Sequence, residues 1–234
     1  MEALDLKQYR CVVFFTGAGM SAESGVPVYR GRGGIWHQYN YEDYACQRAF
    51  DRDPQKVLDF HEVRRTRVLG CEPHAGHHHI AKLQSTHPRV HVITQNIDGM
   101  FQRAGVRVDA ELHGSLWRMR CAHHGVHEDR AAASYATRAC EKCGMTLRPD
   151  IVWFEDMVKP EPFEIAERLI RGCDLFVAVG TSAVVYPAAG LPRVAKRAGA
   201  RMIEINPEET EMSSLYDESL RAPASRAIAE SLTL

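Results

Sequence analysis

A short apolar run that ends in a glycine-rich turn, close to the start of the chain, restricts the fold more than any other feature of the sequence. The run covers residues 11–15, and Thr-Gly-Ala-Gly follows it at residues 16–19. Residues 21–24 (Ser-Ala-Glu-Ser) have the composition with which helices begin. The order of strand, glycine turn and helix predicts an α/β unit in this part of the chain.

Three later segments have the composition of further strands. Residues 89–94 contain alternating β-branched residues, and residues 174–179 form the continuous apolar run of a strand buried on both faces. Residues 201–205 resemble a fourth strand, and a helical stretch at 188–198 precedes it. This rhythm predicts an α/β fold with a Rossmann-like parallel sheet. Each strand ends in small or polar residues, so we expect one ligand site at the carboxyl ends of the strands.

Two segments interrupt the rhythm. Residues 35–70 are polar, aromatic and helical in pattern, and residues 121–143 are poor in apolar residues but rich in Cys and His. We interpret both as insertions that pack over the ligand edge of the sheet. The expected division assigns residues 1–37, 81–118 and 147–234 to a Rossmann-like domain. A helical insertion at 38–80 and a metal module at 119–146 form the small domain.

Charge and composition exclude several classes of protein. There are 29 Lys plus Arg and 30 Asp plus Glu, so 29 − 30 gives −1, which argues against a basic nucleic-acid-binding face. The longest uncharged stretch, residues 175–192, contains two glycines and two prolines, so we predict no membrane span. Residues 1–9 do not resemble a secretory signal. Together with an odd number of cysteines, seven, this predicts a cytoplasmic protein without disulfides.

The glycine turn matches a dinucleotide-binding pattern. Residues 17–22 (Gly-Ala-Gly-Met-Ser-Ala) have the form G-x-G-x-x-A between a strand and a helix, and such glycines allow close approach of a pyrophosphate. A merely tight turn is the alternative, since the acidic residue expected after the next strand is missing. The polar end of the last strand, residues 206–208, could hold a ribose instead.

Two pairs of Cys and His residues predict a structural zinc site. Cys121-x-x-His124 and Cys140-x-x-Cys143 have 15 residues between them, which is the spacing of a zinc ribbon with one His in place of Cys. Either His123 or His127 could supply the fourth ligand instead, or the module could be free of metal.

The other His and Cys residues do not by themselves indicate a functional site. His113 before Gly114 is, taken alone, more often a turn residue than a base. His74 and residues 77–79 (three His) are expected at a solvated helix start, and Cys11, Cys46, Cys71 and Cys173 are expected in the core.

Taken together, the motifs resemble the sirtuin family. They are residues 17–30 (Gly-Ala-Gly-Met-Ser-Ala-Glu-Ser-Gly-Val-Pro-Val-Tyr-Arg), 95–98 (Gln-Asn-Ile-Asp), 113–114 (His-Gly), the two metal-binding pairs, 180–182 (Gly-Thr-Ser) and 206–208 (Asn-Pro-Glu). The class III enzymes, which prefer acidic acyl groups, are the most similar because of Ala45 and the pair Arg64 and Arg65. Two departures are His61, where a Tyr is usual, and Glu155, where the family has Gly.

The resemblance implies an NAD-dependent protein lysine deacylase that removes acetyl and succinyl or malonyl groups. NAD is consumed, and nicotinamide and O-acyl-ADP-ribose are released. His113 would be the general base for a ribose hydroxyl, and Asn96 and Asp98 would order the ribose and the carboxamide. An ADP-ribosyltransferase or NAD glycohydrolase, or a protein that senses NAD without turnover, are the alternatives. The expected partners are acyl-lysine proteins, without nucleic acid or membrane, and we expect a monomer.

The resemblance also implies the binding residues. NAD contacts fall on Gly17, Ala18, Gly19, Ser21, Ala22, Tyr29, Arg30, Trp36, Gln95, Asn96, Ile97, Asp98, Gly180, Thr181, Ser182, Asn206, Pro207, Glu208 and Ala224. Substrate contacts fall on Ala45, His61, Arg64, Val152, Trp153, Phe154 and Glu155. One structural zinc is expected on Cys121, His124, Cys140 and Cys143.

The helix that carries His61 and Arg64 leads to a prediction about acyl choice. Val57, Phe60, His61, Arg64 and Val68 share one mostly apolar face, in which a cation requires an anion. A salt bridge to a nearby carboxylate would satisfy Arg64, whereas the resemblance assigns it to the acyl carboxylate. We expect a protonated His61 to add a second positive charge as the pH falls from about 8 to 6.

Overall fold

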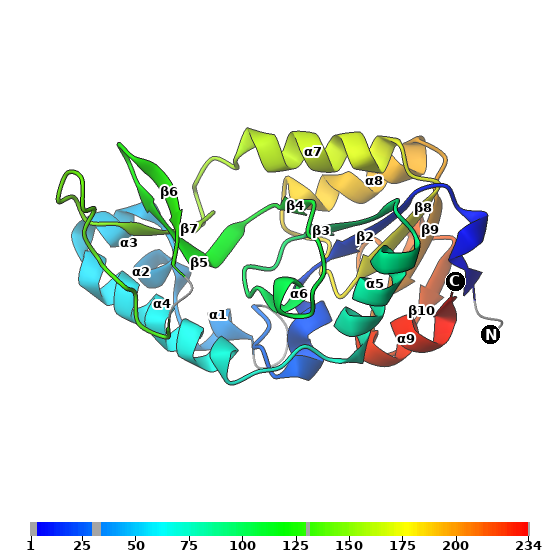
Figure 1. The fold of residues 1–234 in the computed structure, drawn as a ribbon, viewed down its shortest axis with the longest axis horizontal. Helices are drawn as coiled ribbons and strands as arrows, with labels where there is room; N and C mark the ends of the chain where they lie inside the picture. The colour runs from blue at the N-terminus through cyan, green and yellow to red at the C-terminus, as the bar shows by residue number, and fades with distance from the viewer. Residues whose placement is uncertain (1–3, 30–33, 130–131, 234) are drawn as a thin grey trace.

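A parallel sheet forms the centre of the larger part of the molecule (Figure 1). The structure is a computed structural model that describes residues 4–29, 34–129 and 132–233. The sheet has the spatial order β10-β9-β8-β2-β3-β4, and all its neighbouring strands are parallel. Its strands are β2 (Val12–Thr16), β3 (Val90–Thr94), β4 (Ala110–Glu111), β8 (Leu175–Val179), β9 (Arg201–Ile205) and β10 (Glu218–Leu220).

Helices cover both faces of this sheet, as the continuous apolar strands require. On one face lie α5 (Ala75–Thr86) and α9 (Ala224–Ser231), and on the other lie α7 (Pro160–Arg171) and α8 (Leu191–Arg197) (Figure 1). Alternate residues of β2 enter the two cores: Phe14 packs with the α5 and α9 side, and Phe15 with the α7 and α8 side. The predicted α/β fold with a Rossmann-like parallel sheet is therefore confirmed.

A second, antiparallel sheet lies beyond the ligand edge of the first. It has the order β6-β5-β7 and consists of β5 (Gly114–Cys121), β6 (Gly125–Glu128) and β7 (Arg148–Ile151). Beside it lie α1 (Ile35–Gln38), α2 (Tyr41–Tyr44), α3 (Gln47–Arg52) and α4 (Pro54–Leu69) (Figure 1). Residues of this sheet and of these helices share one apolar cluster. The exact domain boundaries given above stay a prediction.

Short elements complete the chain. β1 (Leu4–Asp5) pairs in parallel with β11 (Leu232–Thr233) and so brings the two ends together, and α6 (Met100–Arg103) follows β3. The described residues also form the 3-10 helices η1 (Leu6–Gln8), η2 (Ala18–Ser24), η3 (Ala188–Gly190) and η4 (Ser213–Leu215). In the described part of the chain, no helix combines the length and apolar character needed to cross a membrane.

The helix that follows the glycine turn is a 3-10 helix rather than an α-helix. The chain forms the 3-10 helix η2 directly from Ala18, and Gly25 ends it with φ of 90°. The 3-10 helix ends at Ser24, because Gly25 takes the left-handed conformation and Pro27 follows two residues later. A helix therefore follows the glycine turn as predicted, but it is a 3-10 helix that begins at Ala18, before the predicted start at residues 21–24.

The buried face of α4 also differs from the prediction. Asp53 caps the helix by accepting a hydrogen bond from the Lys56 N–H at 3.0 Å, and Pro54 occupies the first turn. The buried cation on this helix is Arg65, which is fully buried, whereas Arg64 is only half-buried. Arg64 lies at the edge of the predicted apolar face, with its guanidinium carbon 5.8 Å from the Phe60 ring centre, and the sequence did not single out Arg65 as the buried cation.

Candidate functional site

Two glycine-containing loops meet at the carboxyl edge of the parallel sheet. The Gly17 N–H donates to the Val179 carbonyl at 3.0 Å, and the Gly19 N–H donates to the Gly180 carbonyl at 2.9 Å. A Cβ atom on Gly19 would lie 2.7 Å from the Gly180 Cα, and Gly180 itself has φ of 59°. The glycines are therefore needed for the contact between the loops that follow β2 and β8, in addition to any approach of a ligand.

Polar side chains from four strand ends meet beside these loops. The Gln95 Nε2 donates to the Thr181 Oγ1 at 3.1 Å, the Asn96 Nδ2 to the Ser21 Oγ at 3.3 Å, and the Asn206 Nδ2 to the Thr181 carbonyl at 3.1 Å. Ser21, Asn96 and Thr181 are buried. These hydrogen bonds join the segments that follow β2, β3, β8 and β9 in one polar cluster, where the sequence predicted a ligand site.

Asp98 is a buried carboxylate at the end of this polar cluster. Burial raises its pKa, although hydrogen bonds from the Met100 N–H and from Ser21 partly oppose that shift. The Trp117 indole N–H donates to the Asp98 carbonyl at 2.7 Å, and Gly99 leaves room for this ring. Trp117 was not among the predicted site residues, although a glycine directly after Asp98 signals the close approach of another group.

His113 lies between the two sheets. Its Nδ1 is 3.1 Å from the Gln95 carbonyl oxygen, and because a carbonyl only accepts, Nδ1 carries the proton and Nε2 keeps its lone pair. Burial lowers the pKa of His113, and the hydrogen bond to Gln95 opposes part of that shift. The ring is therefore neutral near pH 7 and can accept a proton at Nε2.

Gly114 explains how the chain passes from one sheet to the other at this histidine. It has φ of 79°, and a Cβ there would lie 2.0 Å from the Asp150 carbonyl oxygen. Only glycine permits β7 to approach so closely. An ion-pair network centred on the buried Asp150, which was not predicted from the sequence, lies beside this crossing. The Arg118 side chain pairs with Glu111 and Asp150, and Lys159 also pairs with Asp150.

The predicted substrate segment lies between His113 and Ala45. The Val152 N–H donates to the His113 carbonyl at 2.9 Å, and the Phe154 N–H donates to the Ala45 carbonyl at 3.0 Å. Ala45 is buried and Phe154 is half-buried. The structure therefore brings Ala45, Val152 and Phe154 to one side of the proposed base.

His61 is fully buried and stacks on Trp153 with ring centroids 5.8 Å apart. Its Nε2 accepts a hydrogen bond from the Trp153 indole N–H at 3.2 Å, so the proton of the neutral ring is on Nδ1, which has no partner among the described residues. Burial, with the nearby positive charges of Arg64 and Arg148, lowers the pKa of His61 well below its usual value. The expectation that His61 gains a charge between about pH 8 and 6 was therefore wrong.

Arg64 and Arg65 have different environments. The Arg65 Nη2 pairs with Asp129 at 3.3 Å and donates to the Ala132 carbonyl at 2.7 Å. The Arg64 guanidinium instead donates to the Tyr29 hydroxyl and lies 4.9 Å from the centre of that ring. Within residues 4–29, 34–129 and 132–233, Arg64 forms no salt bridge with a carboxylate. The alternative that Arg64 serves a structural salt bridge therefore has no support among these residues.

The remaining predicted contacts lie around this centre. Ala18 and Ala22 belong to η2, and Ala224 is the first residue of α9. The two helices are in contact, because the Ser225 N–H donates to the Glu23 carboxylate at 3.0 Å. The rings of Tyr29 and Trp36 lie 5.9 Å apart. Arg30 lies outside the described residues. Ile97 is buried, whereas the loops after β8 and β9 leave Ser182, Pro207 and Glu208 exposed.

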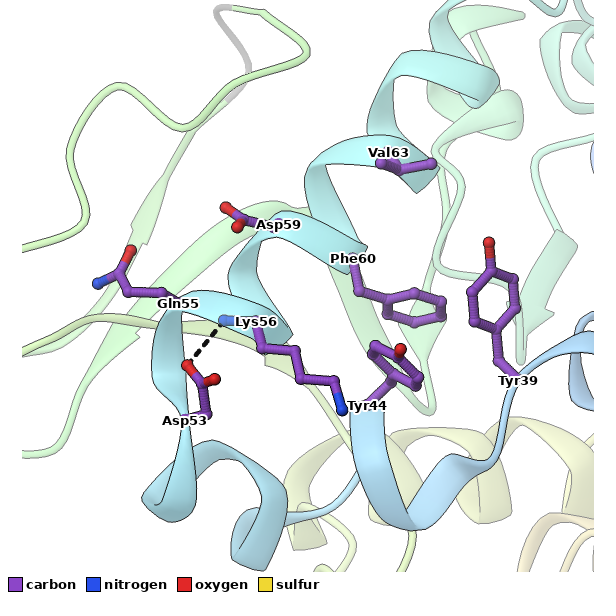
Figure 2. A pocket seen from close by; sticks show the side chains of 8 residues that line it. All are labelled: Tyr39, Tyr44, Asp53, Gln55, Lys56, Asp59, Phe60 and Val63. Atoms are coloured by element: carbon purple, nitrogen blue, oxygen red, sulfur yellow. Dashed lines mark hydrogen bonds between the residues drawn. The ribbon is translucent and has the colours of Figure 1, made fainter.

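A separate hollow of about 430 Å³ opens beside α4 (Figure 2). Its aromatic residues pack on one another, with Phe60 5.0 Å from Tyr39 and 4.8 Å from Tyr44 between ring centres. None of the predicted site residues lines it; the lining consists of Tyr39, Tyr44, Asp53, Gln55, Lys56, Asp59, Phe60 and Val63. We therefore locate the candidate site at the strand ends rather than in this hollow.

The histidines at the start of α5 are less solvated than expected. His77 is fully buried, and burial lowers its pKa to about 3. Its Nδ1 accepts the His74 N–H at 3.3 Å, while the His74 ring accepts the Gly76 N–H at 3.0 Å. These rings cap α5, so the prediction of a solvated helix start was wrong for His77.

The four predicted metal ligands meet at the far end of the second sheet. One ligand atom from each of Cys121, His124, Cys140 and Cys143 lies within 4.8 Å of all the others. The Sγ atoms of Cys121 and Cys143 are 3.7 Å apart, and the His124 Nδ1 is 3.6 Å and 3.4 Å from the Sγ atoms of Cys121 and Cys140. Tetrahedral bonds of about 2.3 Å to sulfur and 2.0 Å to nitrogen require separations of roughly 3.5 to 3.8 Å.

These donors fit Zn²⁺ in both chemistry and geometry. The N–H of His123 lowers the pKa of the Cys121 thiol, which favours the thiolate that binds metal. His123 and His127 are exposed and do not belong to the cluster. Of the histidines considered above, His124 therefore has the position for the fourth ligand.

Comparison with known proteins decides the family. The model of the Sir2 family matches residues 17–187, which include the glycine turn, His113 and all four metal ligands. A relative from Pyrobaculum aerophilum, "NAD-dependent protein deacylase 2", is 45% identical over 219 residues, which cover 93% of this chain and 88% of the relative. The chain belongs to the Sir2 family. The resemblance to sirtuins is therefore confirmed.

Solved structures of Sir2 proteins share the same fold. A mutant Sir2 homologue in complex with ADP-ribose superposes with a TM-score of 0.91 at 38% identity, covering 96% of this chain and 91% of that one. A Sir2 protein bound to a p53 peptide and NAD⁺ superposes with a TM-score of 0.82 at 28% identity, covering 96% and 92%. These proteins have ligands of the kinds that the Sir2 resemblance implies.

Proposed function

We propose that this protein is an NAD-dependent protein lysine deacylase, in agreement with the name of its Pyrobaculum relative. The observation that carries the proposal is the position of His113 between the polar strand ends and the segment at 152–154. The His113 Nδ1–H donates to the Gln95 carbonyl, and the His113 carbonyl accepts a hydrogen bond from the Val152 N–H at 2.9 Å. One neutral base therefore faces the region where a dinucleotide and an acyl-lysine would meet.

NAD is the co-substrate that this site would bind, and it supplies the ADP-ribosyl group that accepts the acyl group when nicotinamide is released. The buried polar atoms of Ser21, Asn96, Asp98 and Thr181 fit such a polar ligand. We assign Asn96 and Asp98 to orienting the ribose and the carboxamide. His113 then takes the proton of a ribose hydroxyl at Nε2, because its Nδ1 is already committed to Gln95.

Zinc has a structural role in this proposal. Four protein ligands complete a tetrahedral coordination and leave no position for a reacting water. The Cys3His set therefore stabilises the end of the second sheet rather than acting on the substrate.

The alternative of ADP-ribosyl transfer or NAD hydrolysis depended on Glu155 disturbing the docking of a peptide. Glu155 has φ of 69°, the conformation that a glycine would supply there. The preceding Phe154 keeps its hydrogen bond to Ala45. This observation favours deacylation over the alternative.

The test of this function is mass spectrometry of acetyl-lysine, succinyl-lysine and unmodified peptides incubated with the enzyme and NAD. His113→Ala should keep NAD affinity and lower deacylation roughly 100- to 10,000-fold, the usual cost of a missing general base. His123→Ala serves as a control because His123 is exposed and remote from the strand ends. Deacylation within a few-fold of the parent in His113→Ala would exclude His113 as the base.

We further propose that the enzyme accepts acidic acyl groups, such as succinyl and malonyl, in addition to acetyl. Three observations support this: Ala45 is small, Arg64 has no carboxylate partner among the described residues, and the His61 Nδ1–H is buried without an acceptor. An acyl carboxylate would give both donors an acceptor. Because the pKa of His61 is lowered, Arg64 supplies the positive charge, and ionisation of His61 does not alter acyl choice.

Acyl choice is measured as the ratio of kcat/KM for succinyl and acetyl peptides of one sequence. Arg64→Met should lower this ratio by about 10- to 150-fold, the value of one charge-assisted hydrogen bond. His61→Tyr should keep the preference, since a phenol also donates. The ratio in the parent should not grow between pH 8 and pH 6. An unchanged ratio in Arg64→Met, with unchanged KM for NAD, would make the enzyme a plain deacetylase.

The predicted monomeric state, the absence of nucleic-acid binding and the cytoplasmic location remain predictions. Gel filtration tests the first, and titration with DNA tests the second.

A further inference from the structure

Glu155 combines an unusual backbone conformation with an ion pair. Among the described residues, only Glu155 and Ala183 have positive φ without being glycine, and the φ of Glu155 is 69°. In this left-handed region the Cβ atom crowds the following carbonyl, so a glutamate is strained where a glycine would not be. Some other interaction must therefore offset the strain at this residue.

The residues on both sides of Glu155 are anchored. Phe154 forms a bridge with Cys46, and its ring packs 4.4 Å from Tyr41 and 5.5 Å from Trp36 between centroids. Asp156 pairs with the Arg148 guanidinium and accepts the Trp153 N–H at 3.0 Å. The chain must reverse between these two anchors, and Glu155 makes the turn.

The Glu155 side chain reaches across to α3. The Arg48 Nη2 donates to Oε1 at 2.6 Å and the Arg48 Nε donates to Oε2 at 3.0 Å, which is the two-pronged geometry of an arginine with a carboxylate. Arg48 follows Cys46, the residue that pairs with Phe154. The ion pair therefore connects the two segments directly beside their backbone contact.

We propose that Arg48 and Glu155 form a latch that holds the segment at 152–155 in position for the acyl peptide, so that peptide affinity depends on ionic strength. This inference rests on the proposed deacylase function. The latch is a positioning device: neither residue is asked to touch the reacting atoms. Because the Arg48 and Glu155 side chains are 67% and 46% exposed, the pair is weak and screened by salt.

The test is a double-mutant cycle, measured as KM for an acetyl-lysine peptide of zero net charge. Arg48→Met in the parent should raise KM for the peptide about two- to fivefold, the value of an exposed ion pair. The kcat and the KM for NAD should not change. In the Glu155→Gly protein, the same Arg48→Met change should have no effect, because glycine adopts the turn without help.

Ionic strength gives a second measurement on the same proteins. Raising NaCl from about 0.02 M to 0.5 M should raise KM for the peptide in the parent and leave it constant in Glu155→Gly. Arg171→Met is the matched control, because Arg171 forms an ion pair of nearly equal exposure, 64% and 45%, with Glu167 on α7. Thermal unfolding of each variant checks that the fold is intact.

The outcomes separate this inference from the proposed function. Absence of deacylation in the parent would contradict the function itself. If the parent deacylates but Arg48→Met raises KM equally with Glu155 and with Glu155→Gly, the latch does not exist. A salt dependence that persists in Glu155→Gly would overturn it as well.

Discussion

The parallel sheet and the antiparallel sheet of this protein are stabilised in different ways. β2 and β8 are buried along their whole length, and each contributes alternating apolar residues to two cores. In contrast, every residue of β6 is exposed, and the turn at its start contains His124. The apolar cluster that the antiparallel sheet shares with α3 and α4 reaches Cys121 and Cys140, and the four metal ligands lie together at the far end of the sheet.

This difference predicts that the metal cluster affects the stability of the antiparallel sheet and that the polar strand ends carry the chemistry. The polar strand ends rest on an apolar core, whereas we expect the thiolates of the Cys and His cluster to need a bound ion to stay together. We therefore expect loss of the metal to leave the site at the strand ends folded. Three measurements test how far this separation holds.

The largest expected effect is that of zinc removal. Chelation should remove roughly 10 kcal/mol or more of metal-binding free energy and unfold the region from Cys121 to Cys143. Amide hydrogen exchange should become fast in β6 and stay slow in β2 and β8. His124→Ala should lower the zinc content, while His123→Ala and His127→Ala should retain it. Continued protection of β6 without metal would show that the two regions do not differ in this way.

A smaller effect on stability is expected when Arg65, the buried arginine of α4, is replaced. Arg65 is fully buried, pairs with Asp129 and lies 4.5 Å from the Tyr135 ring centre. Arg65→Met should lower the free energy of unfolding by about 3 to 5 kcal/mol, because it leaves a buried carboxylate without its cation. Urea unfolding measures this change. Arg64→Met, the neighbouring control, should cost about 1 kcal/mol or less, and equal costs would contradict the assignment of Arg65 to the core.

The smallest effect is the pH dependence of the free energy of unfolding that His91, near the start of β3, contributes. The hydrogen bond to Asp109 at 3.1 Å, together with Cys11, raises the pKa of His91 to about 9. Burial opposes ionisation of Asp109, but hydrogen bonds from His91 and the Val92 N–H lower its pKa overall. Because the pKa of His91 is higher in the folded state, the stabilisation is complete below about pH 6.5 and is lost as the pH rises through 9.

Solvent access reduces this contribution to about 1 kcal/mol. The measurement compares the free energy of unfolding of the parent and His91→Gln at pH 6 and pH 9.5. We expect the difference to be about 1 kcal/mol at the lower pH and near zero at the higher pH. A difference that is constant with pH would mean that His91 does not ionise in the folded protein.

Local patterns predicted the elements and the ligands well. The strands β2, β3, β8 and β9 lie within one residue of the predicted segments, because a strand buried on both faces must be apolar throughout. The metal ligands were also predictable, since Cys and His pairs at short spacing are typical of zinc sites. By contrast, the short strands β4 and β10 were missed, because two or three residues carry no clear pattern.

The sequence by itself determined the parallel sheet, the polar strand ends and the Cys3His set, because each depends on residue type and local spacing. Only the tertiary structure decided which neighbouring arginine is buried, that His61 stays neutral beneath Trp153, and that Glu155 turns back to meet Arg48. These properties depend on groups that are 92 residues apart, as for His61 and Trp153, or 107 residues apart, as for Arg48 and Glu155. Burial and charge pairing are set by such distant neighbours, and no local pattern contains them.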